Sequence, residues 1–177
     1  MLRPGLLPKT IVDVGTGSGC IAVSLAKFIA NAEITATDIS PVALEISRQN
    51  AILNKVSERI KFVCADLFKD YRLRIQDYDM IVSNPPYIPG AEIAGLQPEV
   101  RREPHVALDG GRDGLDFYRR IIARAPHYLR KGGLLIMEMG FQQREAIENI
   151  FREPGIFEVT EVVKDYNNID RVIVARV

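Results

Sequence analysis

Apolar runs rich in β-branched residues alternate with stretches of helical periodicity, and this alternation constrains the fold more than any other feature of the chain. Strands are predicted at residues 10–14, 33–37, 59–63, 78–83 and 134–139, and helices at residues 18–30, 40–54, 115–129 and 142–151. Two further β-rich runs, 157–163 and 171–177, flank Tyr166-Asn167-Asn168 and predict a terminal hairpin. This order predicts an α/β fold, with a doubly wound, mostly parallel seven-stranded sheet and an antiparallel terminal strand at its edge.

The bulk composition narrows the classes of protein that the chain could represent. Its 177 residues, 47% of them hydrophobic, suit a single domain over residues 1–177 with a sizeable core. Lys plus Arg and Asp plus Glu both number 23, so no global charge favours stable nucleic-acid binding. Cys20 and Cys64 are predicted to be buried free thiols, and His105 and His127 lack the neighbours of a metal site, so no metal is expected. No signal peptide and no apolar run of ~18 residues is visible, so we expect a cytoplasmic protein without a membrane partner.

The segment after the fourth strand, residues 88–113, is rich in Pro, Gly and charged residues. It is predicted to be a long loop with at most a short helix around residues 95–101. Loops of this length inside a compact domain tend to be functional.

A glycine-rich turn joins the first strand to the first helix. It consists of Gly15, Thr16, Gly17, Ser18 and Gly19. The glycines allow a sharp turn and the close approach of a ligand, and backbone N–H groups at the start of the helix favour an anionic group. Nicotinamide and flavin enzymes use similar turns, so the turn alone predicts a cofactor site without identifying the cofactor.

Three acidic residues accompany the turn at the carboxyl ends of neighbouring strands. Asp38 ends the second strand, where a carboxylate can accept both hydroxyls of a ribose, in NAD or in S-adenosylmethionine equally well. Asp66 follows the third strand and is predicted to accept from an adenine amino group, with Leu67 packing on the ring. Asp13 lies at the end of the first strand, where it either meets the cationic part of a cofactor or orients the glycine turn.

The fourth strand ends in Asn84, Pro85, Pro86 and Tyr87. Proline cannot donate to a sheet ladder, so the chain leaves the sheet here, at a strand's carboxyl end, where open α/β sheets bind ligands. The Asn84 side-chain oxygen and the Pro85 carbonyl can hold a planar NH₂ group while the Tyr87 ring lies on the flat group. Such a slot would pin a poorly nucleophilic nitrogen and align it with a methyl carbon and its leaving sulfur. The motif therefore predicts group transfer to a planar nitrogen.

Together these motifs resemble the HemK/PrmC family of S-adenosylmethionine-dependent methyltransferases, which modify a glutamine side chain at N5. The resemblance extends over nearly the whole chain and includes residues 12–19, 36–41, 66–68, 81–89, 103–104, 107–118 and 170–172. It implies a class I, Rossmann-like methyltransferase fold, with S-adenosyl-L-methionine as cofactor and S-adenosyl-L-homocysteine as product. The implied substrate is the glutamine of the Gly-Gly-Gln loop in peptide chain release factors, and a close relative acts on a glutamine of a large-subunit ribosomal protein.

The resemblance also implies roles for individual residues. Cofactor contacts fall to Gly15, Thr16, Gly17, Gly19, Asp38, Leu67 and Asn84, to which the motifs above add Asp13, Ser18 and Asp66. Residues 84–87 would hold the glutamine amide, with Asn84, Pro85 and Tyr87 as the catalytic residues and Pro86 in the substrate-binding set. The loop at residues 107–115 would shape the side that faces the protein substrate.

The chain departs from the family at its start. Family members usually carry an N-terminal helical domain and a Pro-Arg-x-Glu-Thr-Glu-like segment, whereas only residues 1–9 precede the first strand here. We therefore expect an excised or truncated catalytic domain whose cofactor pocket lacks a covering segment.

Two other interpretations stay open from the sequence alone. Adenine-N6 methyltransferases of nucleic acids use a similar Asn/Asp-Pro-Pro-Tyr slot, but they usually add basic or target-recognition elements that are not visible here. A cofactor-binding scaffold that has lost its activity is the other, and the intact Asn84 argues against it. A dehydrogenase would leave residues 84–87 unexplained, and Ala107-Leu108-Asp109-Gly110-Gly111 favours the glutamine family.

Overall fold

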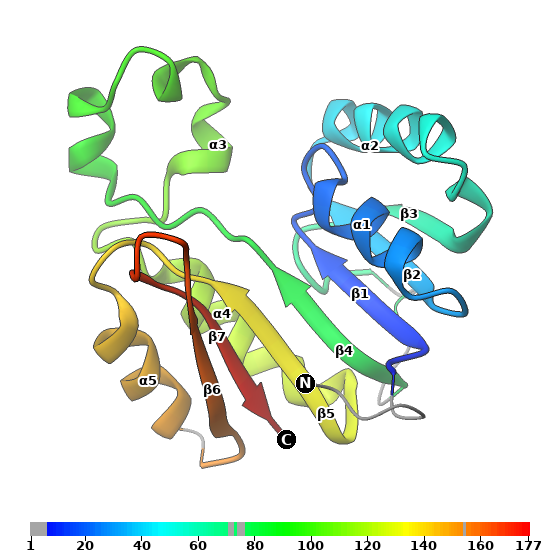
Figure 1. Ribbon diagram of the computed structural model, residues 1–177. Coiled ribbons are helices and arrows are strands. Elements are labelled where there is room, and N and C mark those ends of the chain that lie inside the picture. Colours follow the sequence, from blue (N-terminus) through cyan, green and yellow to red (C-terminus); the bar gives the residue numbers. More distant parts are fainter. Residues whose placement is uncertain (1–6, 71–72, 74–76, 154) are drawn as a thin grey trace.

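A seven-stranded sheet with helices on both faces forms the framework of the protein (Figure 1). The computed structural model describes residues 7–70, 73, 77–153 and 155–177. The strands are β1 (Thr10–Val14), β2 (Glu33–Asp38), β3 (Ile60–Cys64), β4 (Tyr78–Ser83), β5 (Leu129–Glu138), β6 (Glu158–Lys164) and β7 (Asp170–Arg176). The helices are α1 (Cys20–Phe28), α2 (Pro41–Leu53), α3 (His105–Leu108), α4 (Asp116–Arg124) and α5 (Arg144–Arg152).

The strand order is β3-β2-β1-β4-β5-β7-β6, with β1 to β5 parallel and β7 antiparallel to both of its neighbours. This confirms the predicted doubly wound, mostly parallel sheet with an antiparallel terminal strand. The order reverses between β1 and β4, and open α/β sheets bind ligands at the carboxyl ends of the strands at such a reversal.

The prediction that the antiparallel strand lies at the edge is wrong. The last strand, β7, sits between β5 and β6, and β6 forms the edge. The reason is burial, because Ile173 and Ala175 of β7 are fully buried whereas no residue of β6 is. The charged residues Glu158, Glu161 and Lys164 suit β6 to the edge, where a strand must resist pairing with other chains.

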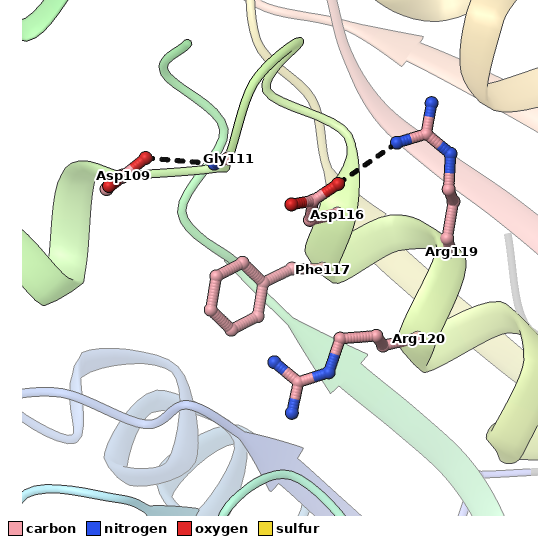
Figure 2. A pocket seen from close by; sticks show the side chains of 6 residues that line it. All are labelled: Asp109, Gly111, Asp116, Phe117, Arg119 and Arg120. Carbon is pink, nitrogen blue, oxygen red and sulfur yellow. Dashed lines mark hydrogen bonds and ion pairs between the residues drawn. The ribbon is translucent and has the colours of Figure 1, made fainter. Parts of the chain in front are cut away.

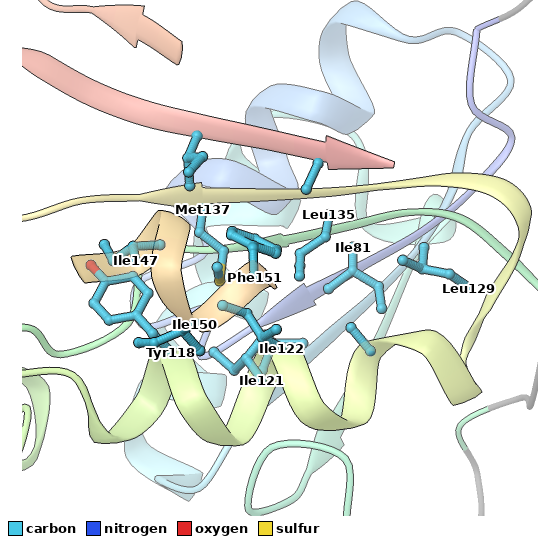
Figure 3. Close-up of a cluster of buried hydrophobic side chains, with 14 of the residues drawn as sticks. Ile81, Tyr118, Ile121, Ile122, Leu129, Leu135, Met137, Ile147, Ile150 and Phe151 are labelled. Atoms are coloured by element: carbon cyan, nitrogen blue, oxygen red, sulfur yellow. The ribbon is translucent and has the colours of Figure 1, made fainter. Parts of the chain in front are cut away.

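Alternation along the strands divides the core into two clusters, one on each face of the sheet. In β1, Val12 and Val14 join one cluster and Ile11 joins the other. The first cluster packs under α4 and α5, where the side chains of Tyr118 and Ile121 point toward the central strands (Figure 3). The second cluster packs under α1 and α2. Because helices cover both faces of the sheet, nearly every residue of the central strands is buried, and their sequences are nearly continuous apolar runs.

The predicted helix at residues 115–129 is too long. The α-helix ends at Arg124, a 3-10 turn follows at Ala125–His127, and β5 begins at Leu129. Lys131-Gly132-Gly133, expected to end the helix, instead lies inside β5. There Gly132 takes the left-handed conformation, with a φ of 77°, and the pairing with β4 shifts register between Tyr78 and Met80.

The segment at residues 88–113 contains more helix than predicted. It forms two 3-10 helices, Gly90–Gly95 and Val100–Arg102, and the short α3, whereas the predicted helix covered residues 95–101. In Figure 1 this segment extends beyond the carboxyl ends of the strands. It therefore stands over the edge of the sheet where the motifs lie.

The two cysteines also differ from expectation, since both are exposed. Cys20 is the first residue of α1, and Cys64 ends β3, the outermost parallel strand, so neither reaches the core. Within the described residues, no helix is long and apolar enough to cross a membrane. The predicted terminal hairpin is present, and Asn168 takes a left-handed φ of 63° in its turn.

We expect the core under α4 to dominate the stability of the fold. Ile121 is fully buried, so Ile121→Ala should lower the free energy of unfolding by ~2–5 kcal/mol through lost burial and a residual cavity. The same change at Ile52, which is 64% exposed on α2, should alter it by less than ~0.5 kcal/mol. Urea unfolding of the two variants measures the difference, and equal effects would contradict this account of the core.

Candidate active site

The glycine turn is tight on its inner side and open on its outer side. Gly15 and Gly17 have left-handed φ values of 72° and 55°, and a Cβ on either would meet nothing within 4 Å. Gly19 has a φ of 82°, and a Cβ there would lie 2.2 Å from the Ser47 Oγ of α2. The turn can therefore accept a ligand at Gly15 and Gly17, while Gly19 lets α1 and α2 pack closely.

Asp13 lies fully buried beneath this turn. Its Oδ2 accepts hydrogen bonds from Thr16 Oγ1 at 2.7 Å and from the Ala22 backbone N–H at 3.1 Å. Burial raises the pKa of Asp13 to about 6, because a charge is costly in an apolar interior. Of the two predicted roles, this geometry fits orientation of the glycine turn. The predicted contact of Asp13 with a cofactor stays a prediction.

Asp38 braces the same turn from β2. Its Oδ2 accepts from the Gly17 N–H and its Oδ1 from the Ser40 N–H, both at 2.8 Å. A carboxylate offers about four acceptor positions, so two remain for the ribose hydroxyls predicted here. Thr16 is buried and Ser18 is exposed, with the Ser18 carbonyl accepting from Asn50 of α2 at 2.8 Å.

Asp66 and Leu67 follow β3 at the next position along this edge. Asp66 accepts from Lys69 at 2.8 Å and from Arg120 of α4 at 2.6 Å, and these hydrogen bonds lower the pKa of its carboxyl. The Arg120 guanidinium also lies 5.2 Å from the centroid of the Phe117 ring. Leu67 has a left-handed φ of 53° and packs in part against the core. Their predicted adenine contacts stay predictions.

The end of β4 brings the second motif beside the glycine turn. Val14 and Ser83 are paired residues of β1 and β4, and Ser83 Oγ donates to the Val14 carbonyl at 2.7 Å. The residues that follow each, Gly15 and Asn84, therefore leave the sheet side by side. Asn84 is exposed, and in the described part of the chain its side chain has no hydrogen-bond partner. The amide is thus available to a ligand next to the turn.

The rest of the motif is held in place. Pro85 is buried and Pro86 is half-buried. The Tyr87 ring packs against the core, and its hydroxyl interacts electrostatically with the Glu138 carboxylate at the end of β5. Burial raises the pKa of both Tyr87 and Glu138. Tyr87 therefore forms a fixed wall beside the free Asn84 amide.

The loop at residues 107–115 runs directly alongside the motif. The Ile88 N–H donates to the Leu108 carbonyl at 3.0 Å, and the Gly110 N–H donates to the Ile88 carbonyl at 2.8 Å. A Cβ on Gly110 would lie 2.8 Å from the Tyr87 Cα, so only glycine fits there. The loop thus borders the predicted substrate slot.

A hollow of about 360 Å³ opens between this loop and α4, and we call it the α4 hollow. Figure 2 shows the Phe117 and Arg120 side chains projecting from α4 on one side of it and Asp109 on the other. The lining residues are Asp109, Gly111, Asp116, Phe117, Arg119 and Arg120. Because Arg120 also binds Asp66, the α4 hollow adjoins the predicted adenine position.

Comparison with known proteins agrees with these motifs. The family model for the methyltransferase small domain matches residues 3–97. The chain belongs to the methyltransferase small domain family. The release factor glutamine methyltransferase of Geobacter sulfurreducens is 45% identical over 177 residues, which cover 99% of this chain and 61% of that protein. The protein of the same name from Moorella thermoacetica is 44% identical over 166 residues, 94% of this chain and 58% of its own.

The chain thus spans about 60% of the length of these curated relatives. A methyltransferase from Pyrococcus furiosus has the same fold, with a TM-score of 0.71 at 19% identity over 99% of this chain and 77% of that one. The predicted class I methyltransferase fold is confirmed, as is the resemblance to glutamine methyltransferases of release factors.

Several residues of this candidate site were not predicted from the sequence. They are Phe117, Arg120, Glu138 and Gln143. The last two could have been found, since Glu138 and Gln143 flank the carboxyl end of β5, at the same sheet edge as Asn84. The sequence does not indicate that Phe117 and Arg120 lie at the site, because their positions depend on how α4 crosses the sheet.

The stability of the fold should depend on pH through Asp13. Its folded pKa of about 6 lies above the ~3.9 of an unfolded aspartate, so the folded state holds the proton more tightly. The resulting stabilisation is fully present below pH ~4 and is lost as the pH rises through ~6, a change of about 2–3 kcal/mol. Asp13→Asn does not titrate. The difference in unfolding free energy between wild type and Asp13→Asn, measured by urea unfolding, should therefore change by this amount between pH 4 and pH 7. The same difference at both pH values would contradict the prediction.

Proposed function

We propose that this chain transfers a methyl group from S-adenosylmethionine to the side-chain nitrogen of a glutamine in a peptide chain release factor. The observation that supports this most directly is the free, exposed Asn84 amide beside the open glycine turn. The relatives named release factor glutamine methyltransferase, at 44–45% identity, support the choice of acceptor.

The residues of the glycine turn fit the cofactor. Gly15 and Gly17 leave open space where a side chain would stand, and Asp38 retains free acceptor positions for a ribose. Asp66 and Leu67 would lie at the adenine, and Asp13 supports the turn from below. When bound, S-adenosylmethionine supplies a methyl group on a cationic sulfur.

The slot at the end of β4 would hold the acceptor. The Asn84 side-chain oxygen and the Pro85 carbonyl accept the two N–H groups of the glutamine amide, and Pro86 and Tyr87 bound the slot. This restrains a weak nucleophile in the orientation that the reaction needs. Asn84 and Pro85 would hold this nitrogen in line with the methyl group that bound S-adenosylmethionine would supply, and the nitrogen would lose one proton to water.

Methyl transfer from radiolabelled S-adenosylmethionine tests the proposal. We expect label on a release factor and none on its Gly-Gly-Gln→Gly-Gly-Ala version, because the change removes the acceptor nitrogen. Duplex and single-stranded DNA and RNA, and a large-subunit ribosomal protein, serve as alternative acceptors. Label on any of these in place of the release factor would overturn the proposed substrate.

Asn84→Ala should abolish most turnover while the fold survives. Removal of one positioned polar group at a reacting centre typically lowers the rate by ~10²–10³-fold. Because Asn84 is exposed and its side chain bonds to nothing in the described part of the chain, the unfolding midpoint should stay within ~2 °C of wild type. Label transfer and circular dichroism measure the two quantities. Near-full turnover in this variant would remove Asn84 from the mechanism.

A further inference from the structure

Gln143 occupies a position that neither the motifs nor the proposed function assigns. It follows β5 at the start of α5, and its side chain turns back toward the sheet edge instead of capping the helix. The Gln143 Nε2 donates to the Tyr87 carbonyl at 2.9 Å and to the Gly114 carbonyl at 3.4 Å. Its Oε1 accepts from the Gly140 N–H at 3.1 Å. One amide therefore joins the end of β5, the Asn-Pro-Pro-Tyr motif and the loop before α4.

The backbone around Gln143 is adapted to this arrangement. A Cβ on Gly140 would lie 2.6 Å from Gln143 Oε1, and one on Gly114 would lie 2.7 Å from Gln143 Nε2. The preceding residue, Gln142, takes a left-handed φ of 61°, which is uncommon outside glycine and asparagine. The glycines thus make room for an amide that reaches Tyr87.

The other side of Tyr87 is held as well. Its ring packs against the core, and a Cβ on Gly110 would lie 2.8 Å from its Cα. Of the described residues, Gln143 is the one whose side chain donates to the Tyr87 carbonyl. Without it, the segment that carries the slot would keep the packing of the Tyr87 ring and the backbone hydrogen bonds at Ile88, but would lose the hydrogen bond at the Tyr87 carbonyl.

We infer that Gln143 is a positioning residue that fixes the backbone of the methyl-acceptor slot by holding the Tyr87 and Gly114 carbonyls. The inference rests on the proposed function and deepens it. Gln143 contacts neither the acceptor nor the cofactor, so its loss misaligns the slot while the glycine turn at β1 is unaffected. A misplacement of ~1 Å at a reacting centre can lower the rate by ~10²-fold.

Two substitutions test the inference. Gln143→Met keeps the length of the side chain and removes all three hydrogen bonds. Gln143→Glu keeps the acceptor for the Gly140 N–H but sets a carboxylate against two carbonyl oxygens. The matched control is the exposed neighbour Gln142, changed to Asn, which tolerates a left-handed φ.

Both Gln143 variants should lower kcat by about 10- to 100-fold, with the Kd for S-adenosylmethionine and the KM for the acceptor within threefold of wild type. Gln142→Asn should keep kcat within twofold. A Gln143→Met variant with kcat within twofold of wild type would overturn the inference. Loss of kcat together with a parallel loss of cofactor affinity and a lower Tm would overturn it too, because it would indicate general destabilisation.

The wild-type protein is assayed in parallel, so that a failure of the proposed function can be distinguished from a failure of this inference. If wild type labels a different acceptor, the proposed substrate is wrong and the kcat ratios are measured on that acceptor. If wild type labels none, hydrogen exchange followed by mass spectrometry decides. Exchange at the Ile88, Gly90 and Gly110 amides, which join the motif to its neighbouring loop, should then be faster in Gln143→Met than in Gln142→Asn. Equal exchange in the two variants would overturn the inference.

Discussion

The site depends on the buried carboxylate of Asp13. The hydrogen bonds that it accepts from Thr16 and Ala22 join the end of β1 to the glycine turn and to the first turn of α1. An aspartate in this position is costly when charged, which its raised pKa of about 6 reflects. The gain is a turn in which the left-handed Gly15 and Gly17 leave open space beside them, since the carboxylate supports the turn from within. An apolar residue would be buried at a lower cost in free energy but could not accept these hydrogen bonds.

The end of β4 combines a free side chain with a fixed backbone. Ser83 Oγ binds the Val14 carbonyl, so the point at which Asn84 leaves the sheet is tied to the glycine turn. Tyr87 is held by the packing of its ring against the core and by the hydrogen bond from Gln143 to its carbonyl. Between these anchors Asn84 is exposed. A side-chain amide that binds a substrate needs free hydrogen-bonding groups, so its orientation must be set by the residues around it.

The sequence predicts the parts of this arrangement that are local. The glycine turn, Asp38 and residues 84–87 each follow a strand that can be recognised by its apolar run, and all lie at the carboxyl edge of the sheet. Gln143 lies at this recognisable edge, but the partners of Gln143 and Arg120 could not be predicted, because each acts on a residue more than fifty positions away. The error in β5 has a similar origin. Gly132 and Gly133 look like a helix end until their pairing with Val177 in the sheet is known.

The candidate site is rigid at the glycine turn and more adaptable at Asp66, the proposed adenine position. Asp66, the predicted adenine acceptor, is already bound by Lys69 and Arg120, whose side chains are 67% and 42% exposed. Exposed ion pairs of this kind contribute only ~0–1 kcal/mol, so a ligand can replace or share them at little cost. Arg120 would keep its contact with the Phe117 ring after such an exchange. The glycine turn cannot exchange its contacts in this way, because Asp13, which accepts a hydrogen bond from Thr16 of the turn, is fully buried. In the proposed mode of binding, affinity at the adenine end of the cofactor can therefore vary without disturbing the alignment of the reacting groups at the other end.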